Sequence, residues 1–202
     1  MWGKIKRFWT RHTYRLRRYY WALWSHVYRW LFHRAWRDRL IDTCANEEEA
    51  WKQVKVLTWT EDGAKEMNDA CGSAGWVQHC ISEVNAGREQ PEGALDCDDF
   101  AAWCIEAVDP EYAAMDIFVM SWVGRYNEVQ GHAMARGITK AGVMFHVGNW
   151  GVIGPARNLR DLILLTMKRA QAKELVAWGV LSKNLFPKKI GFEVPSSTLQ
   201  VD

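Results

Sequence analysis

The chain has 202 residues, of which 49% are hydrophobic and 25% are charged. This balance excludes wholesale disorder and allows one domain of ordinary size with an appendage. The net charge of +2 hides an asymmetry: residues 1–40 contain 11 Lys and Arg against one acidic residue, and residues 41–202 contain 15 against 23. A basic, aromatic arm of charge +10 is therefore joined to an acidic body of charge −8. We place the arm at 1–42 and the body at 43–202.

Cysteine usage and hydropathy restrict the compartment. Five cysteines, an odd number without a CxxC pair, argue against a disulfide framework and for a reducing environment. No run of 18 apolar residues exists, which excludes a transmembrane helix. The N-terminus superficially resembles a signal peptide, but no cleavage site follows, so we expect the segment to be retained. A cytoplasmic or virion-associated location is expected, with peripheral membrane contact through the arm as an alternative.

The arm predicts a long amphipathic helix. At 100° per residue, apolar and aromatic side chains recur every three or four residues on one side. This face consists of Trp2, Ile5, Trp9, His12, Leu16, Tyr20, Leu23, Val27 and Leu31. The opposite face carries Lys4, Arg7, Arg11, Arg15, Arg18 and Arg29. Because the pattern drifts after Leu31, we expect the helix to end or turn before Asp42.

Three kinds of partner suit such a helix. They are a protein groove, including one on the protein's own body, an anionic membrane surface, and nucleic acid. We weight the first two about equally and place nucleic acid behind them. The residues expected to make these contacts are Arg7, Arg11, Arg15, Arg18, Trp9, Trp21 and Trp24. Packing on the body would turn the basic face to solvent or toward the acidic body.

The body predicts helices first and an antiparallel sheet afterwards, which is typical of an α+β fold. Helical patterns cover residues 46–60, 61–86, 97–105 and 158–180. Strand patterns cover residues 117–123, 131–138 and 143–148. A loop at 85–95 precedes Asp96, a typical N-cap for the helix at 97–105. The chain from Phe186 onward is irregular, with room for a short strand.

Cys97 is the candidate nucleophile because it lies in the first turn of a predicted helix, directly after a loop. Backbone N–H groups and the helix dipole at such a position stabilise a thiolate. Asp98 and Asp99 oppose this effect, so a histidine is needed both as a cation and to accept the proton. The histidines of the body are His79, His132 and His146.

The predicted hairpin around residues 139–142 selects His132. A two- or four-residue loop gives a register in which Ile138 faces Val143 and His132 faces Asn149. Directly opposite side chains have Cβ atoms roughly 4.5–5.5 Å apart, close enough for an amide to orient an imidazole. A three- or five-residue loop would remove this pairing. The expected triad is therefore nucleophile, base and orienting amide.

Three motifs resemble the transglutaminase-like branch of the papain-fold cysteine peptidases, with bacterial and phage members closest in pattern. They are Cys97-Asp98-Asp99-Phe100-Ala101, Gly131-His132-Ala133 and Asn149-Trp150-Gly151, within residues 70–155. The resemblance implies a papain-like core with Cys97 as nucleophile, His132 as general base and Asn149 as orienter. Many relatives have Asp at the third position, and the arm has no counterpart in the family pattern.

An oxyanion hole would use the backbone N–H of Cys97 and one side-chain donor. The candidate donors are Gln78, Trp76 and Gln90. A zinc site built from Cys97, His132 and Asp99 lacks a second nearby Cys or His, so no metal is expected. No cofactor is expected either.

These patterns predict a thiol hydrolase, a cysteine peptidase or amidase. It would cleave a peptide or isopeptide bond of a peptide or protein substrate through an acyl-enzyme. If an amine resolves the thioester, the same site is a transferase. The alternative is a catalytically inactive papain-like structural or adaptor protein, such as a phage virion component. In that case the arm docks a protein, a membrane or nucleic acid.

Overall fold

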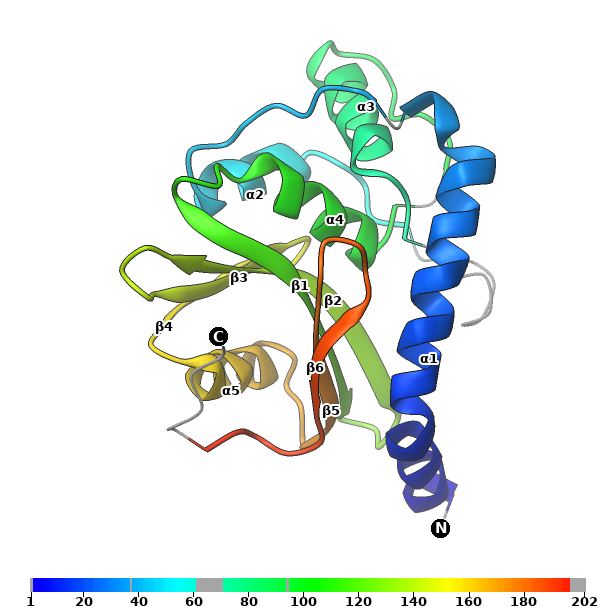
Figure 1. Cartoon of the computed structure of the whole chain (residues 1–202), viewed down its shortest axis with the longest axis vertical. Coiled ribbons are helices and arrows are strands. Elements are labelled where there is room, and N and C mark those ends of the chain that lie inside the picture. The colour runs from blue at the N-terminus through cyan, green and yellow to red at the C-terminus, as the bar shows by residue number, and fades with distance from the viewer. Residues whose placement is uncertain (1, 37, 61–70, 94, 197–202) are drawn as a thin grey trace.

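The computed structural model describes residues 2–36, 38–60, 71–93 and 95–196, with the side chains of the first helix described from Thr13 onward. Helices cover a six-stranded sheet whose order is β4-β3-β2-β1-β5-β6, with every neighbouring pair antiparallel (Figure 1). The predicted α+β class is confirmed. The part of the prediction that falls at 61–70 lies outside the described residues.

Among the described residues, helices α1 to α4 precede strands β1 to β4, and α5 lies between β4 and β5. The helices are α1 Trp2–Phe32, α2 Glu47–Val54, α3 Ala74–Asn85, α4 Cys97–Ala107 and α5 Leu159–Arg169, with a 3-10 turn at Arg34–Trp36. The strands are β1 Ala113–Val123, β2 Val129–Thr139, β3 Met144–Gly148, β4 Gly151–Ala156, β5 Glu174–Leu181 and β6 Pro187–Gly191.

The sheet separates two hydrophobic clusters. Helices α2 and α4 cover one face and α5 covers the other, as Figure 1 shows above and below the strands. On β2, Ala133 and Ala135 belong to the α4 side, whereas Met134 between them belongs to the α5 side. Because successive side chains of a strand point to opposite faces, odd-numbered residues of β1, β2 and β3 face α4 and even-numbered residues face α5.

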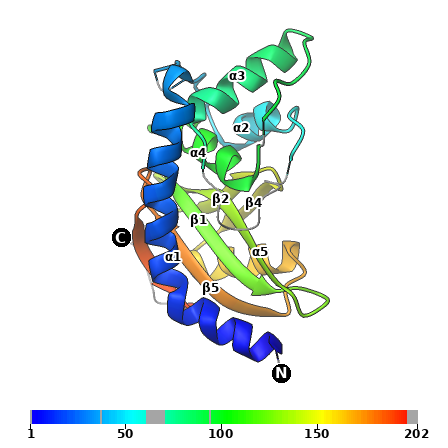
Figure 2. The ribbon, with the colours of Figure 1, turned by 90° about the vertical axis from the view of Figure 1, so that its right-hand side faces the viewer.

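Helix α1 runs along one side of the body over most of the body's length (Figure 2). Its inner face is fixed there by Tyr14 and Trp21, which are 2% and 7% exposed and belong to the α4-side cluster. His26 stacks on Phe186, with 5.7 Å between ring centroids. The arm is therefore part of the folded body along this face.

The predicted helix at 158–180 is wrong in its second half. Helix α5 ends at Arg169, Gln171 adopts a left-handed φ of +51° in the following turn, and the chain continues as β5. Seven of the eight residues of β5 are buried, because this strand lies inside the sheet between β1 and β6. An apolar run that is buried on both faces shows no alternation, so its pattern does not separate strand from helix.

The β2–β3 hairpin has a three-residue loop, and its register differs by one residue from the predicted register. Ile138 pairs with Met144, and Ala135 pairs with Val147. Gly142 has a φ of +76°, and its N–H donates to the carbonyl of Thr139 at 2.8 Å. This is the turn-and-bulge geometry of three-residue hairpin loops, for which a glycine in the left-handed region is favoured. The prediction that His132 faces Asn149 is therefore wrong.

The orientation of α1 leads to a first prediction. Trp21→Ala removes a buried indole and should lower the free energy of unfolding by about 3–5 kcal/mol. Leu23→Ala, at a position that is 58% exposed, should change it by about 0.5 kcal/mol or less. Chemical denaturation of the two variants measures the difference, and equal losses would show that α1 is rotated differently about its axis.

Candidate functional site

Helix α4 begins at Cys97 because Asp96 caps it. The Asp96 carboxylate accepts the Asp98 N–H at 3.1 Å, and the Asp99 carboxylate accepts the Asp96 N–H at 3.3 Å, which completes a capping box. The predicted N-cap is thus confirmed. Cys97 is half-buried, and its Sγ accepts the backbone N–H of Ala133 from β2 at 3.4 Å. The thiol therefore lies at a helix N-terminus beside an N–H donor.

His132 is the neighbour of Ala133 on β2, but its side chain points to the other face of the sheet. Its partner across β1 is Met120, which belongs to the α5-side cluster. The imidazole stacks on the indole of Trp150, with centroids 3.7 Å apart and planes 14° apart. Because Cys97 packs against the α4-side cluster, the sheet separates the expected nucleophile from the expected base.

Burial keeps the His132 imidazole neutral. The residue is 8% exposed, and its Nε2 has no hydrogen-bond partner among the described residues. Loss of solvation lowers the pKa of His132 to about 3. A thiolate–imidazolium pair requires a protonated ring, so at neutral pH His132 supplies no cation to Cys97.

Asn149 lies in the turn between β3 and β4, where Gly148 pairs with Gly151. The one-residue change in register puts Trp150, and not Asn149, against the His132 ring. The Asn149 Oδ1 is buried without a hydrogen-bond partner in the described part of the chain. Among the described residues, neither His132 Nε2 nor Asn149 Oδ1 has a hydrogen-bond partner, so the two expected partners are not joined through these atoms.

The two glutamines predicted as oxyanion donors serve the scaffold instead. Gln78 is buried in α3, where its Oε1 accepts the Trp103 Nε1–H at 2.9 Å and its Nε2 donates to Asp42 Oδ2 at 2.7 Å. Gln90 exchanges hydrogen bonds of 2.7 and 3.2 Å with the backbone of Thr58. Because both amides are engaged elsewhere, neither acts as the expected donor in this structure.

A buried polar contact, here called the Arg29–Cys71 lock, joins α1 to the segment before α3. The Arg29 guanidinium donates from Nε to the Cys71 carbonyl at 3.0 Å and from Nη2 to its Sγ at 2.9 Å. The Cys71 N–H donates to Ser25 Oγ at 3.0 Å, and the Gly72 N–H donates to the Asp99 carboxylate. Burial raises the pKa of Cys71 to about 12, so its sulfur stays a thiol.

The sulfur of Cys71 and the carboxylates of Asp98 and Asp99 lie within 4.8 Å of one another, a spacing that a metal ion could use. Arg29 already supplies the positive charge at this place. Burial acts to lower the pKa of Arg29, but the opposing effects of Cys71, Asp99 and Asp98 outweigh it and leave the pKa above its ordinary value. The carboxylates of Asp98 and Asp99 and the Cys71 side chain therefore stabilise the charged guanidinium of Arg29.

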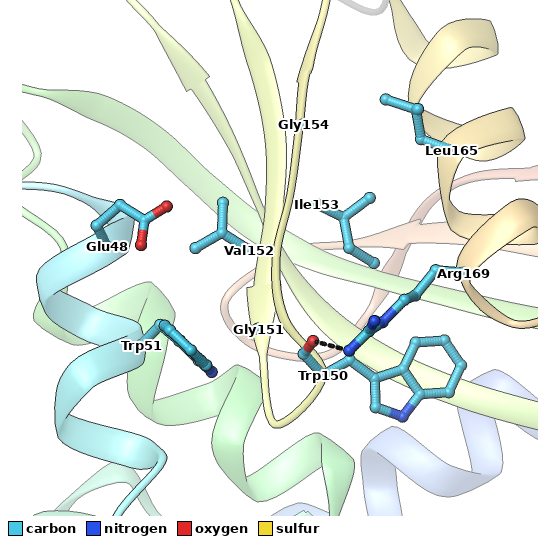
Figure 3. A pocket seen from close by; sticks show the side chains of 9 residues that line it. All are labelled: Glu48, Trp51, Trp150, Gly151, Val152, Ile153, Gly154, Leu165 and Arg169. Carbon is cyan, nitrogen blue, oxygen red and sulfur yellow. Dashed lines mark hydrogen bonds between the residues drawn. The ribbon is translucent and has the colours of Figure 1, made fainter.

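A shallow hollow of about 440 Å³ lies across the edge strand β4 (Figure 3). Glu48 and Trp51 from α2 border it on one side of the strand, and Leu165 and Arg169 from α5 border it on the other. Arg169 donates to the Trp150 carbonyl at 3.0 Å. The lining contains no Cys, Ser, Thr or His, so the hollow offers no nucleophile or proton acceptor of those types.

The residues expected to contact a partner from the arm have different environments. Trp21 is buried against the body, as the self-docking alternative allows, and Trp24 is half-buried. The Arg18 guanidinium lies over the rings of Tyr14 and Trp21, 5.2 and 5.6 Å from their centroids. Arg15 is exposed. Arg7, Trp9 and Arg11 lie outside the described side chains.

The apolar face predicted for the arm is the face that the structure leaves in solvent. We call its described part, together with the exposed Trp30, the outer stripe, which consists of Leu16, Tyr20, Leu23, Val27, Trp30 and Leu31. These side chains are between 45% and 72% exposed. Helical periodicity found this face in the sequence, but not its direction, because the body contacts the opposite, more polar face through Ser25 and Arg29.

No protein-family model matches the chain, and a search of the curated proteins finds no match. Among the described residues, no helix is both long and apolar enough to cross a membrane. We therefore infer a function from the geometry of the Cys97 region and of the outer stripe.

The buried imidazole leads to a second prediction. The pKa of His132 is lower in the folded protein than its ordinary value of 6.5. The neutral ring therefore contributes its full stabilisation above pH 6.5, and this stabilisation is lost as the pH falls from 6.5 toward 3. His132→Phe keeps a ring against Trp150 and removes the titrating group. Between about pH 7.5 and 5, the wild type should lose about 2 kcal/mol more unfolding free energy than the variant.

The measurement is denaturant unfolding at the two pH values. Burial also lowers the pKa of His146, but that residue is present in both proteins and cancels from the comparison. The same loss in both proteins would mean that His132 titrates normally and is accessible to protons.

Proposed function

We propose that this protein is a docking or adaptor protein and that the outer stripe of α1 is its working surface. The observation that carries the proposal is the orientation of the helix. Tyr14, Trp21 and Ser25 are buried against the body, whereas Leu16 and Leu23 are 72% and 58% exposed. A helix that only completed the core would bury its apolar face and expose its arginines. A contiguous exposed apolar surface is typical of an interaction site.

The body then acts as the platform that holds α1 in this orientation. The Arg29–Cys71 lock connects the helix to the start of α4 through Asp99. The His26 ring lies on Phe186, and its Nε2 lies 3.1 Å from the Asn184 carbonyl oxygen. Under this proposal the protein works at a surface, as a peripheral membrane or virion-associated component.

A thiol hydrolase is the second candidate, and one observation favours it. Cys97 is half-buried in the first turn of α4, and its Sγ accepts the Ala133 N–H, two features that stabilise a thiolate. Against it stand the neutral His132 on the other face of the sheet and the carboxylates of Asp96 and Asp98 beside the sulfur. Hydrolysis would require His132 to leave Trp150 and reach the α4 face.

The third prediction separates the two candidates by the dependence of Cys97 reactivity on His132. Cys97 should react with iodoacetamide faster than the other cysteines in either case, because those are buried and burial raises their pKa values. They are Cys44, Cys71, Cys80 and Cys104. A docking protein should show the same Cys97 rate in wild type and in His132→Phe. A hydrolase should show a fall of about tenfold or more.

Mass spectrometry of each labelled cysteine provides the rate and an internal control. Faster labelling of Cys71 and Cys104 in the variant would reveal unfolding, in which case His132→Gln serves as the replacement. A Cys97 rate that depends on His132 in a folded variant contradicts the docking proposal and supports the hydrolase.

A further inference from the structure

We propose that the outer stripe docks onto an anionic lipid surface, with α1 lying in the plane of the membrane interface. This inference rests on the proposed docking function and names its partner. From Leu16 to Trp30 the stripe residues follow one another at intervals of three or four along α1, and Leu31 lies four residues after Val27, so they form a continuous row. Its described part, from Leu16 to Leu31, is about 22 Å long at 1.5 Å per residue.

The charges beside the stripe favour lipid headgroups. Arg15 and Arg17 are exposed and lie about 100° to either side of Leu16 around the helix. At 100° per residue, Lys6 falls on the same flank as Arg17, whereas Lys4, Arg7 and Arg11 fall on the face opposite the stripe. A row of apolar side chains between two basic flanks matches a membrane interface, where the acyl region lies beneath a layer of phosphates.

The absence of acidic residues argues against a second copy of the chain as the occupant. The sequence contains no Asp or Glu from residue 2 to residue 32. Two copies that joined their outer stripes would bring Arg15 and Arg17 of one copy near the same residues of the other, and the two paired helices would offer no acidic residue between positions 2 and 32 to offset the repulsion. Helices that pair through an apolar seam normally place opposite charges along its edges. An anionic surface supplies that negative charge.

The aromatic side chains of the stripe also favour a position at the membrane interface. Tyr20 and Trp30 are 60% and 57% exposed, and such side chains favour the level of the headgroups because each combines an apolar ring with a polar group. Leu23 and Val27 lie between them in the row and would enter the acyl region. The body is attached to the opposite side of α1 by Trp21 and Arg29, so it would remain on the aqueous side.

The experiment is co-sedimentation of the full chain with lipid vesicles. The test variant is Leu23→Glu/Val27→Glu on the stripe. The matched control is Leu164→Glu/Leu165→Glu on α5, where the two leucines are 43% and 36% exposed. Both variants add the same charge at exposed positions, so thermal unfolding should be close to wild type in both. The vesicles contain phosphatidylcholine alone or with about 25% phosphatidylserine.

The wild type and the α5 variant should bind the phosphatidylserine vesicles at least about tenfold more strongly than the neutral vesicles. The stripe variant should lose about tenfold or more of this binding. Arg15→Gln/Arg17→Gln, which leaves the apolar row intact, should weaken binding to the anionic vesicles about tenfold and leave binding to neutral vesicles unchanged. Raising NaCl from about 0.1 M to about 0.5 M should have a similar effect.

Wild-type protein that does not bind the vesicles, or that binds both kinds equally, overturns the lipid inference. So does a folded stripe variant that binds like the α5 control. The same proteins are tested for self-association by sedimentation velocity and for binding to a single-stranded oligonucleotide. Suppose that the wild type does not bind vesicles but does self-associate or bind the oligonucleotide, and that the stripe variant loses this activity. The lipid inference then fails and the docking function stands. A Cys97 reactivity that depends on His132 overturns the docking function instead.

Discussion

The structure depends on the buried contact that fixes one face of α1 to the body. Arg29 and Ser25 bind the backbone and thiol of Cys71, and the adjacent Gly72 donates to Asp99 in the capping box of α4. An unpaired buried guanidinium or carboxylate is costly, so these groups hold one another in place. Because this polar face has its partners inside the protein, the apolar face has none there and points outward.

Structural contacts of the same kind also determine the arrangement of the side chains around Cys97. The Asp98 and Asp99 backbone and side chains belong to the cap and to the network with Arg29. His132 fills a place in the α5-side core by stacking on Trp150. The Asn149 Oδ1 is buried without a hydrogen-bond partner among the described residues, and the Cys97 thiol, which is partly exposed, accepts the Ala133 N–H. His132, the expected proton acceptor, lies across the sheet from this thiol.

Local features could be predicted from the sequence, and features set by distant contacts could not. The Asp96 cap, the β2 and β3 strands and the amphipathic period of α1 each depend on a few neighbouring residues. The hairpin register depends on the φ of Gly142, since one additional residue in the loop moves every pair along. The direction of α1 depends on Cys71, 42 residues from Arg29, and no local pattern contains that information. The neighbour of His132 across the hairpin is set by this register. An error of one residue in the predicted register therefore gave the wrong neighbour for His132.

The direct test of this account is the solvent exposure of the stripe methyl groups in the folded protein. Methyl-labelled NMR with a soluble paramagnetic chelate measures it for Leu16, Leu23 and Val27, with Leu175 and Val180 of β5 as buried references. We expect strong broadening of the three stripe methyl signals, little broadening of the two references, and recovery of the stripe signals when anionic bicelles are added. Stripe methyl groups that are as protected as the β5 references before any lipid is added would contradict the account.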